Sequence, residues 1–422
     1  MLPPRSPQPS SARAVVAALA LVAVLLGSPS VTAQPFGALS QDAAVGVPDL
    51  ARLGAGGAVT ALPTVDSPFP ANPAHIARTE RLGISVVGVT AGAGGNVRES
   101  YNFYDQELGP AIEDGLERMR DEDPERLEAL YREALRVGGE QKTLDLAVLA
   151  PSVRARLGGV ALGAGLYGHA VTRGQILDGG AGVPYVDLYS QADVLVPAVV
   201  GLDLAPFGVP VAVGASATYV QRRLTAKGEP IDALQPDAEK LYVLRGEGVR
   251  LGAGVLARDV VVPGLDLAAE VTDLGSALGY DYDRSVDVSG SEGAPDDEAE
   301  IAALQARFAG READPVVRVG AAFRLPSVPG LSGAALALDY TTASTSEFGQ
   351  SVQAGLRGGA RATLGGLLEV QAGLSQGMPS AGAALGTRVV RLAYATYGVE
   401  DGRLLGQRRR RAHAVQLRLG LF

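Results

Sequence analysis

Short segments in which apolar and polar residues alternate one by one recur along the chain from about residue 80 onward. The clearest runs from Leu368 to Ser375, with apolar side chains on one face and polar side chains or glycine on the other. Segments 315–325 and 411–422 alternate in the same way, with arginine on the polar face. A period of two predicts β-strands. Charges that recur on the inward face favour a wet interior over a dry sandwich core, where an unpaired charge is costly.

We predict about fourteen strands, an even number typical of bacterial barrels with both ends in the periplasm. The predicted strands cover residues 81–90, 142–150, 153–172, 193–203, 210–221, 247–258, 263–272, 315–325, 331–342, 351–364, 366–376, 380–386, 388–398 and 411–422.

The lengths of the predicted connections support a closed barrel. Long connections follow odd-numbered strands and short, proline-containing turns follow even-numbered ones, as expected when odd strands run outward and periplasmic turns are short. We therefore expect a closed antiparallel transmembrane β-barrel. The long connections are 91–141, 173–192, 222–246 and 273–314, and the turns lie at Pro151, 206–210, Pro263 and 326–330.

Two of the long connections carry apolar residues at helical spacing, within 110–137 and 296–309. Asp123 and Pro124 in the first of them have the character of a helix cap and a first helical residue. We expect partly helical extracellular loops. Amphipathic helices there would either close the barrel mouth or be surface helices without a function of their own.

The start of the chain has the features of a secretion signal. Arg5 and Arg13 precede the apolar stretch 14–27, and Val31–Ala33 fits a small-residue cleavage site. We therefore predict a signal peptide at 1–33, a segment before the first strand at 34–80 and the barrel at 81–422. Apolar residues make up 47% of the chain and its mean hydropathy is +0.15, which strands facing lipid on one side explain.

Composition excludes several kinds of chemistry. The chain has no cysteine, so it forms no disulfide, lipid anchor or cysteine-held metal site. Beyond the predicted signal it has 35 basic and 46 acidic residues, a net charge of −11 that argues against a nucleic-acid partner. We expect no cofactor and no metal, and no enzyme activity.

The stretch from residue 51 to residue 74 closely resembles the N-terminal signature of the FadL-like outer-membrane superfamily. A Gly-Gly-Ala stretch is followed, after a spacer containing an aspartate, by Asn-Pro-Ala just before the first strand. The closing segments 373–377 and 394–398 look like those of PorV-like and TraF-like members. The residues that carry the signature are Gly54, Gly56, Gly57, Ala58, Asp66, Asn72, Pro73 and Ala74.

This resemblance implies a barrel of about fourteen strands with the segment before strand one folded into the lumen as a hatch. It also implies a channel for a hydrophobic small molecule. The alternative is a non-transporting scaffold of a secretion or conjugation system, with partner proteins of that system. The expected surroundings are outer-membrane lipid and lipopolysaccharide.

The residues of the signature have a physical interpretation of their own. Glycines let the backbone bend tightly and pass close to a barrel wall. Pro73 keeps Asn72 out of the helical region, so the Asn72 amide can bond to nearby backbone in a turn. The alternative is an ordinary turn before a strand.

Three further features are candidates for sites. Arg408, Arg409, Arg410 and Arg411 lie in the predicted loop before the last strand, where they would contact lipopolysaccharide phosphates or simply be solvated. His169 would need a serine partner to act in an outer-membrane lipase. The acidic residues Asp281, Asp283 and 296–298 match no known calcium loop, so a solvated surface is the better interpretation.

Overall fold

The computed structural model describes residues 50–62, 69–79, 82–179, 183–233, 240–274, 278–287, 296–308, 315–342, 355–387, 389–400 and 409–421. The predicted signal peptide, Asp66 and Arg408 lie outside these residues, so their roles stay predictions.

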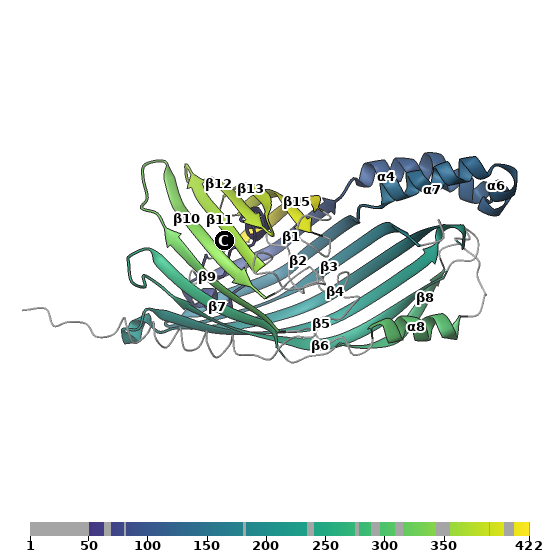
Figure 1. Ribbon diagram of the computed structural model, residues 1–422. Coiled ribbons are helices and arrows are strands. Elements are labelled where there is room, and N and C mark those ends of the chain that lie inside the picture. The colour runs from purple at the N-terminus through teal and green to yellow at the C-terminus, as the bar shows by residue number, and fades with distance from the viewer. Residues whose placement is uncertain are drawn as a thin grey trace, which may run out of the picture.

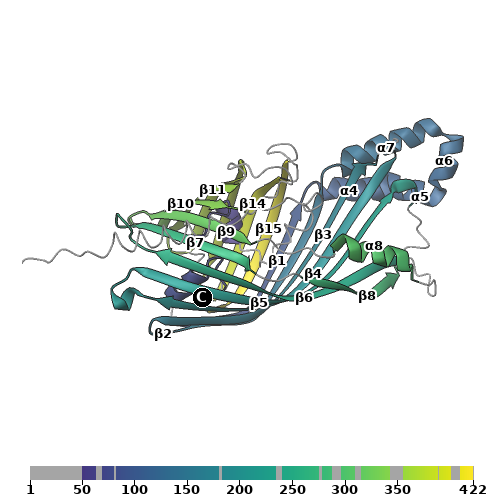
Figure 2. The ribbon, with the colours of Figure 1, turned by 60° about the horizontal axis from the view of Figure 1, so that its bottom comes forward.

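One antiparallel sheet curls round and closes on itself (Figures 1 and 2). Neighbours in sequence pair with one another, β15 pairs with β1, and β6 pairs with both β7 and β8, one above the other. The described strands thus fill fourteen positions round the ring, which confirms the predicted closed barrel. They are β1 (Leu82–Gly94), β2 (Lys142–Leu157), β3 (Val160–Asp178), β4 (Pro184–Asp203), β5 (Val211–Pro230), β6 (Lys240–Ala257), β7 (Leu265–Leu274), β8 (Gly279–Asp287), β9 (Val316–Arg324), β10 (Leu331–Thr341), β11 (Leu356–Leu364), β12 (Leu368–Ser375), β13 (Met378–Gly386), β14 (Val390–Glu400) and β15 (Arg409–Leu421).

Side chains alternate between the two faces of this wall as the sequence predicts. On β10, Leu336 and Leu338 point outward and are 51% and 59% exposed, whereas Asp339 points inward and is 1% exposed. An apolar outer face and a polar inner face are what a strand needs when lipid lies on one side and a wet lumen on the other.

The wall is much taller on one side than on the other. Strands β4 and β5 each have 20 residues, whereas β12 has eight. On the outer face of β5 the apolar series ends at Tyr219, and beyond it Gln221 and Arg223 point outward. Since outward polar side chains do not suit hydrocarbon, the upper half of β5 extends past the membrane on the extracellular side, together with the parts of β4 and β6 that pair with it.

This extension corrects two predicted loops. Residues 173–192 and 222–246 are largely strand, not loop. Outside the lipid, outward positions become polar, so the alternation that marks a membrane strand disappears although the pairing continues. The same reasoning explains why β8, with its aspartates at alternate positions, was missed.

The predicted turn at Pro151 is also wrong. Strand β2 continues through this proline with a shift of register between Leu149 and Ser152, as a β-bulge allows. The chain turns instead at Gly158, whose φ of 62° favours glycine.

The helical loops are present. The first loop holds a helical module at residues 97–138, which extends beyond the tall side of the barrel (Figure 1). The loop after β8 holds α8 (Glu298–Phe308). No helix in the described part of the chain is both long and apolar enough to cross a membrane. The module consists of α4 (Val97–Phe103), η2 (Tyr104–Leu108), α5 (Gly109–Asp114), α6 (Leu116–Glu122) and α7 (Pro124–Gly138); the remaining helices are α3 (Leu50–Gly54), η1 (Pro73–Arg78), η3 (Ala205–Phe207) and η4 (Ile231–Ala233).

Candidate functional site: an internal plug and an apolar path

The segment before β1 lies inside the barrel and reaches from one wall to the other. Helix α3 contacts β12 to β15, and η1 contacts β3 to β6 on the opposite side. We call residues 50–62 and 69–79 together the plug. Ala58, Thr60 and Ile76 in it have no exposed surface. The plug therefore occupies the lumen across its width.

Glycines on both walls allow this close fit. A Cβ on Gly214 of β5 would run into the backbone of Pro73, and one on Gly373 of β12 would run into the backbone of Ala55. In the plug itself, Gly56 has a φ of 66° and turns the chain beside the backbone of Leu374. Small residues in the plug and in the barrel wall thus let the two backbones touch.

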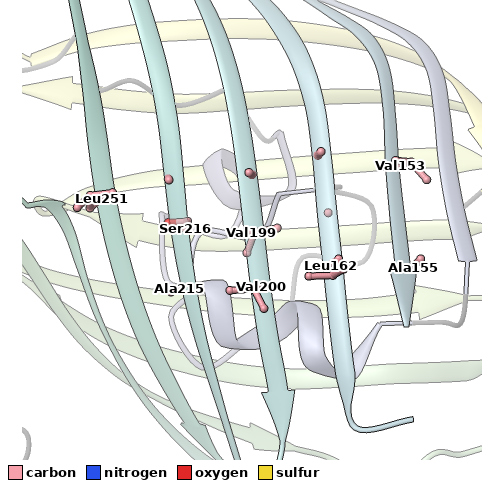
Figure 3. Close-up of a pocket in the computed structure, with 12 residues that line it drawn as sticks. Val153, Ala155, Leu162, Val199, Val200, Ala215, Ser216 and Leu251 are labelled. Atoms are coloured by element: carbon pink, nitrogen blue, oxygen red, sulfur yellow. The ribbon is translucent and has the colours of Figure 1, made fainter. Parts of the chain in front are cut away.

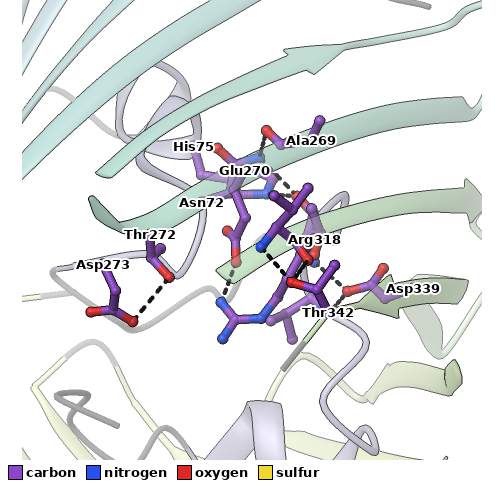
Figure 4. A network of polar contacts seen from close by, with 12 residues as sticks. Asn72, His75, Ala269, Glu270, Thr272, Asp273, Arg318, Asp339 and Thr342 are labelled. Carbon is purple, nitrogen blue, oxygen red and sulfur yellow. Dashed lines mark hydrogen bonds and ion pairs between the residues drawn. The ribbon is translucent and has the colours of Figure 1, made fainter. Parts of the chain in front are cut away.

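Hydrogen bonds at Thr60 join the two halves of the plug, and Figure 4 shows their partners Asn72, His75 and Asp339. The Thr60 carbonyl accepts from Asn72 Nδ2 at 3.1 Å and lies 3.0 Å from His75 Nε2. The backbone N–H groups of Val59 and Thr60 both donate to Asp339 Oδ2, each at 2.7 Å. We call these four contacts, with the residues that make them, the latch.

Asn72 also ties the plug to the wall. Its Nδ2 lies 3.2 Å from the Val255 carbonyl of β6 and 3.4 Å from the Ala269 carbonyl of β7. Its Oδ1 accepts from the Ala74 N–H at 3.0 Å, which is the turn predicted from the Asn-Pro pair. Beside it, the buried Glu270 carboxylate pairs with Arg318 of β9. The Asn72 side chain of the plug is thus hydrogen-bonded to backbone carbonyls of two wall strands, β6 and β7.

The structure gathers most of the predicted signature residues, but at two places. Gly54, Gly56, Gly57 and Ala58 lie near β11 to β13, where Ser380 Oγ donates to the Gly54 carbonyl at 3.0 Å. Asn72, Pro73 and Ala74 lie against β5 and β6. Sequence reasoning missed Asp339 and His75, because nothing in their spacing links them to Thr60.

An apolar path follows the inner wall of the tall side. It consists of three clusters of side chains that share members. Tyr280 contacts both the outer and the middle cluster, and Phe69 of the plug contacts both the middle and the lower cluster. The outer cluster is Tyr189, Leu224, Tyr242, Leu244, Leu304 and Phe308; the middle one is Leu149, Tyr167, Leu195, Val220 and Leu278; the lower one is Ile76, Ala161 and Val199.

Helix α8 covers the outer end of this path. Its Leu304 and Phe308 pack on the outer cluster, as the helical spacing predicts. At the start of α8, Asp296 accepts from Lys240 Nζ at 3.0 Å and from the Tyr282 hydroxyl at 2.5 Å. Asp283 pairs with Arg223. The Asp296 and Asp283 carboxylates thus have basic or hydroxyl partners. Within the described ranges, no group of residues is arranged to hold a metal ion.

Apart from this path and the small apolar side chains that pack directly on the plug, the described lumen carries polar and charged side chains. Arg222 and Asp193 form a buried pair with two contacts of 2.8 Å, and strands β9, β11 and β14 carry inward arginines. His169 lies opposite Asp193 in the pairing of β3 with β4, and its Nε2 lies 3.1 Å from Asp145 Oδ2. No serine in the described part of the chain reaches the His169 ring, so the lipase hypothesis has no support here.

Arg409, Arg410 and Arg411 lie at the extracellular end of β15, not in a loop. Arg409 and Arg411 point outward and are exposed, and Arg411 Nη1 donates to the Pro379 carbonyl at 2.8 Å. Arg410 points inward and is 5% exposed. Contact with lipopolysaccharide therefore stays a prediction for Arg408, Arg409 and Arg411, since Arg410 is turned towards the lumen.

The outer surface also carries an apolar groove, of about 490 Å³, across β2 to β6 (Figure 3). Its lining runs from Val153 and Ala155 of β2 to Leu251 of β6 and includes small side chains such as Ala198 and Ala215. It lies on the lipid-facing side of the wall section that meets η1.

These features define a class of protein: a transmembrane β-barrel whose lumen is filled by an N-terminal plug. No protein-family model matches the chain, and no curated protein matches its sequence. Among solved structures it is similar to the Ralstonia pickettii toluene transporter TbuX, with 11% identity, a TM-score of 0.46 and coverage of 88% of this chain and 98% of that one.

It is also similar to the Pseudomonas putida toluene transporter TodX, with 12% identity, a TM-score of 0.45 and coverage of 88% and 96%. A Pseudomonas aeruginosa FadL homologue matches with 10% identity, a TM-score of 0.38 and coverage of 89% and 98%. At such values the function of this chain has to be argued from its own residues. Membership of the PorV or TraF branch stays a prediction.

Proposed function

We propose that this protein is an outer-membrane channel that takes up a hydrophobic small molecule, with the plug as its gate. The observation that carries the proposal is the apolar path from α8 to the plug. Each cluster along it faces the lumen, where water-exposed polar side chains would otherwise be expected. A chain of apolar side chains inside a polar lumen gives an apolar solute a favourable route.

The contact between the plug and the path supports a gating role for the plug. Phe69 packs edge-on against Tyr167, with ring centroids 5.3 Å apart. The path therefore ends on a residue of the plug and not on the fixed wall. A solute that reaches the middle cluster meets the plug, and passage requires Phe69 to move.

We expect a charge placed in the middle of the path to abolish uptake. In Val220→Glu a carboxylate replaces a fully buried apolar side chain of the middle cluster. Burying a lone charge costs several kcal/mol, so an apolar solute would have to pass an ionised, hydrated site. Entry of an environment-sensitive apolar dye into vesicles that contain the protein should fall at least tenfold.

The matched control is Ser375→Glu, which adds the same charge to the lumen side of β12, away from the path. It should leave dye entry near the wild-type rate. Equal uptake by Val220→Glu and wild type, with both variants folded, would contradict the proposed route. A hydrophobic molecule that copurifies with wild type, identified by mass spectrometry, would name the ligand.

The alternative function is a scaffold that binds a partner protein through the extracellular helices. The observation in its favour is that the helical module 97–138 is held in place on the barrel by an apolar cluster, in which Phe103, Leu116 and Tyr131 are joined by Ile231 and packed against Ile176 and Val186. Tyr101 and Tyr104 on it are 65% and 58% exposed. The barrel thus fixes the module in one position, with these two tyrosines accessible to a partner protein.

Replacing residues 97–138 by a short glycine–serine linker separates the two functions. The scaffold function predicts that proteins captured by the purified chain are lost on replacement and that neither form takes up the dye. The channel function predicts unchanged uptake and no specific capture by either form. Capture that survives the replacement would remove the scaffold hypothesis as formulated for these helices.

A further inference from the structure

The apolar band on the outer face of the barrel ends differently at its two ends. At the extracellular end of β5, Tyr219 is followed on the outer face by the polar Gln221. On β15, the outward residues beyond Val415 are His413 and Arg411. At the periplasmic end of the described strands, apolar residues instead continue from the strands into the turns.

Six turns join the described strands at the periplasmic end, and each has an exposed large apolar side chain in it or next to it. Leu157, Phe207 and Val261 are 80%, 75% and 80% exposed, more than any other large apolar side chain in the described part of the chain. Four of these turns, 158–159, 204–210, 325–330 and 365–367, contain no charged residue. We call the exposed apolar residues of the six turns the rim; they are Leu157, Phe207, Val261, Val328, Leu367 and Val389.

The charged side chains at the periplasmic end are paired with one another. Asp203, at the end of β4, pairs with Arg78 of the plug and with Arg156 of β2. Asp266, at the start of β7, pairs with Arg324 of β9. Both carboxylates are buried on the inner face of the wall. The polar groups here thus satisfy one another at the lumen, and the rim is left as an apolar edge.

The height of the apolar outer face indicates what surrounds the rim. On β5 the outward apolar series runs from Val211 to Tyr219. Eight steps of about 3.3 Å, tilted by about 40°, give a height of roughly 20 Å, whereas the apolar band of an outer-membrane barrel is about 25 Å tall. Phe207 and Val209, in the turn that precedes β5, continue this face towards the periplasm and supply the missing height.

We propose that the rim is inserted into the periplasmic leaflet of the bilayer, so that lipid covers all six turns. Two observations choose lipid over a periplasmic protein. The rim is continuous with the lipid-facing side chains of the strands, such as Leu157 with Val153 and Ala155 on β2. It also encircles the barrel, because turns of the tall flank and of the short flank both contribute. A bilayer surrounds a barrel on all sides, whereas a partner protein would cover one part of its edge.

The backbone at Val261 agrees with a lipid environment. Its φ of 68° lies in the region that favours glycine, and a β-branched residue is strained there. In water an exposed valine offers nothing to offset this strain, and glycine would adopt the same turn without it. In hydrocarbon the buried side chain stabilises the turn by removing apolar surface from water. The inference concerns the outer surface, so it does not depend on the proposed channel.

Single tryptophans test the proposal, since the chain has none of its own and each one reports only on its site. Phe207→Trp and Leu157→Trp probe the rim on the tall flank, and Leu367→Trp probes it on the short flank. Leu336→Trp, on the outer face of β10, is the control for the middle of the band. Tyr101→Trp, on the helical module, is the control for water. Folded variants are placed in vesicles of ordinary phospholipid or of phospholipid brominated on its acyl chains, and the loss of tryptophan emission is measured.

Bromine near the head group should quench the three rim variants more strongly than Leu336→Trp, and bromine near the methyl end should reverse this order. Tyr101→Trp should lose no emission to either lipid and should be quenched by acrylamide in the water. Rim tryptophans that respond to acrylamide as Tyr101→Trp does, and not to bromine, would overturn the proposal and leave the rim accessible to a periplasmic protein. Bromine quenching on the tall flank without quenching of Leu367→Trp would overturn it as well, because lipid would then cover only one side.

Discussion

Planar bilayers that contain Gly214→Val should show an open pore where wild type is closed. The added side chain would overlap the Pro73 backbone and push η1 from the wall. Overpacking of this kind costs about 1–3 kcal/mol, and adding Gly373→Val on the opposite wall should roughly double the cost. We expect the contacts between plug and wall to break before the wall distorts. The strands that carry both glycines are held to their neighbours by continuous backbone hydrogen bonds. Single-channel recording measures the result.

Gly168→Val is the control for this prediction. Gly168 lies in β3, and a Cβ there meets nothing within 4 Å. Its conductance should equal that of wild type. A closed trace for the double glycine variant, with the barrel folded, would show that the close fit at the two walls does not hold the plug.

Removal of one partner of the buried pair Asp193–Arg222 should be the most destabilising change in the barrel wall. The Asp193 side chain has no exposed surface and that of Arg222 is 5% exposed. In Arg222→Met the carboxylate keeps only Gln191 Nε2, at 2.7 Å. A buried charge left without its partner typically costs about 3–5 kcal/mol. Urea unfolding in vesicles, followed by loss of the compact band in unheated gels, gives the difference.

Two further variants test the cause. Asp193→Leu combined with Arg222→Met removes both charges and should recover most of the stability, because nothing charged is then left unpaired. Arg245→Met breaks a pair with Glu247 in which both side chains are more than 40% exposed, and it should cost at most about 1 kcal/mol. Equal losses in Arg222→Met and Arg245→Met would contradict the argument.

The barrel could be predicted from the sequence because lipid imposes a strict rule on each membrane strand. The β12 alternation and the pairing of β15 with β1 follow from it, and both are present. The rule ends at the membrane surface. For this reason the sequence pattern predicts loops at the upper halves of β4 and β5. It likewise predicts a turn at Pro151, where the strand has a bulge.

The site was only partly predictable. The glycines and the Asn72 turn are local features that short sequence patterns express. The latch depends on a contact between Thr60 and Asp339, which are 279 residues apart in the chain. The apolar path likewise combines residues from several strands. Spacing within a strand contains no information about which residues of other strands stand beside it.

The unequal height of the wall has a consequence for the bilayer. Strands β11 to β13 have only eight or nine residues, close to the minimum of about 9–11 for crossing a membrane. Acyl chains beside them must shorten to avoid a hydrophobic mismatch, whereas those beside β4 and β5 need not. The protein thus creates a local thinning of the bilayer on one flank, opposite the flank that carries the apolar path.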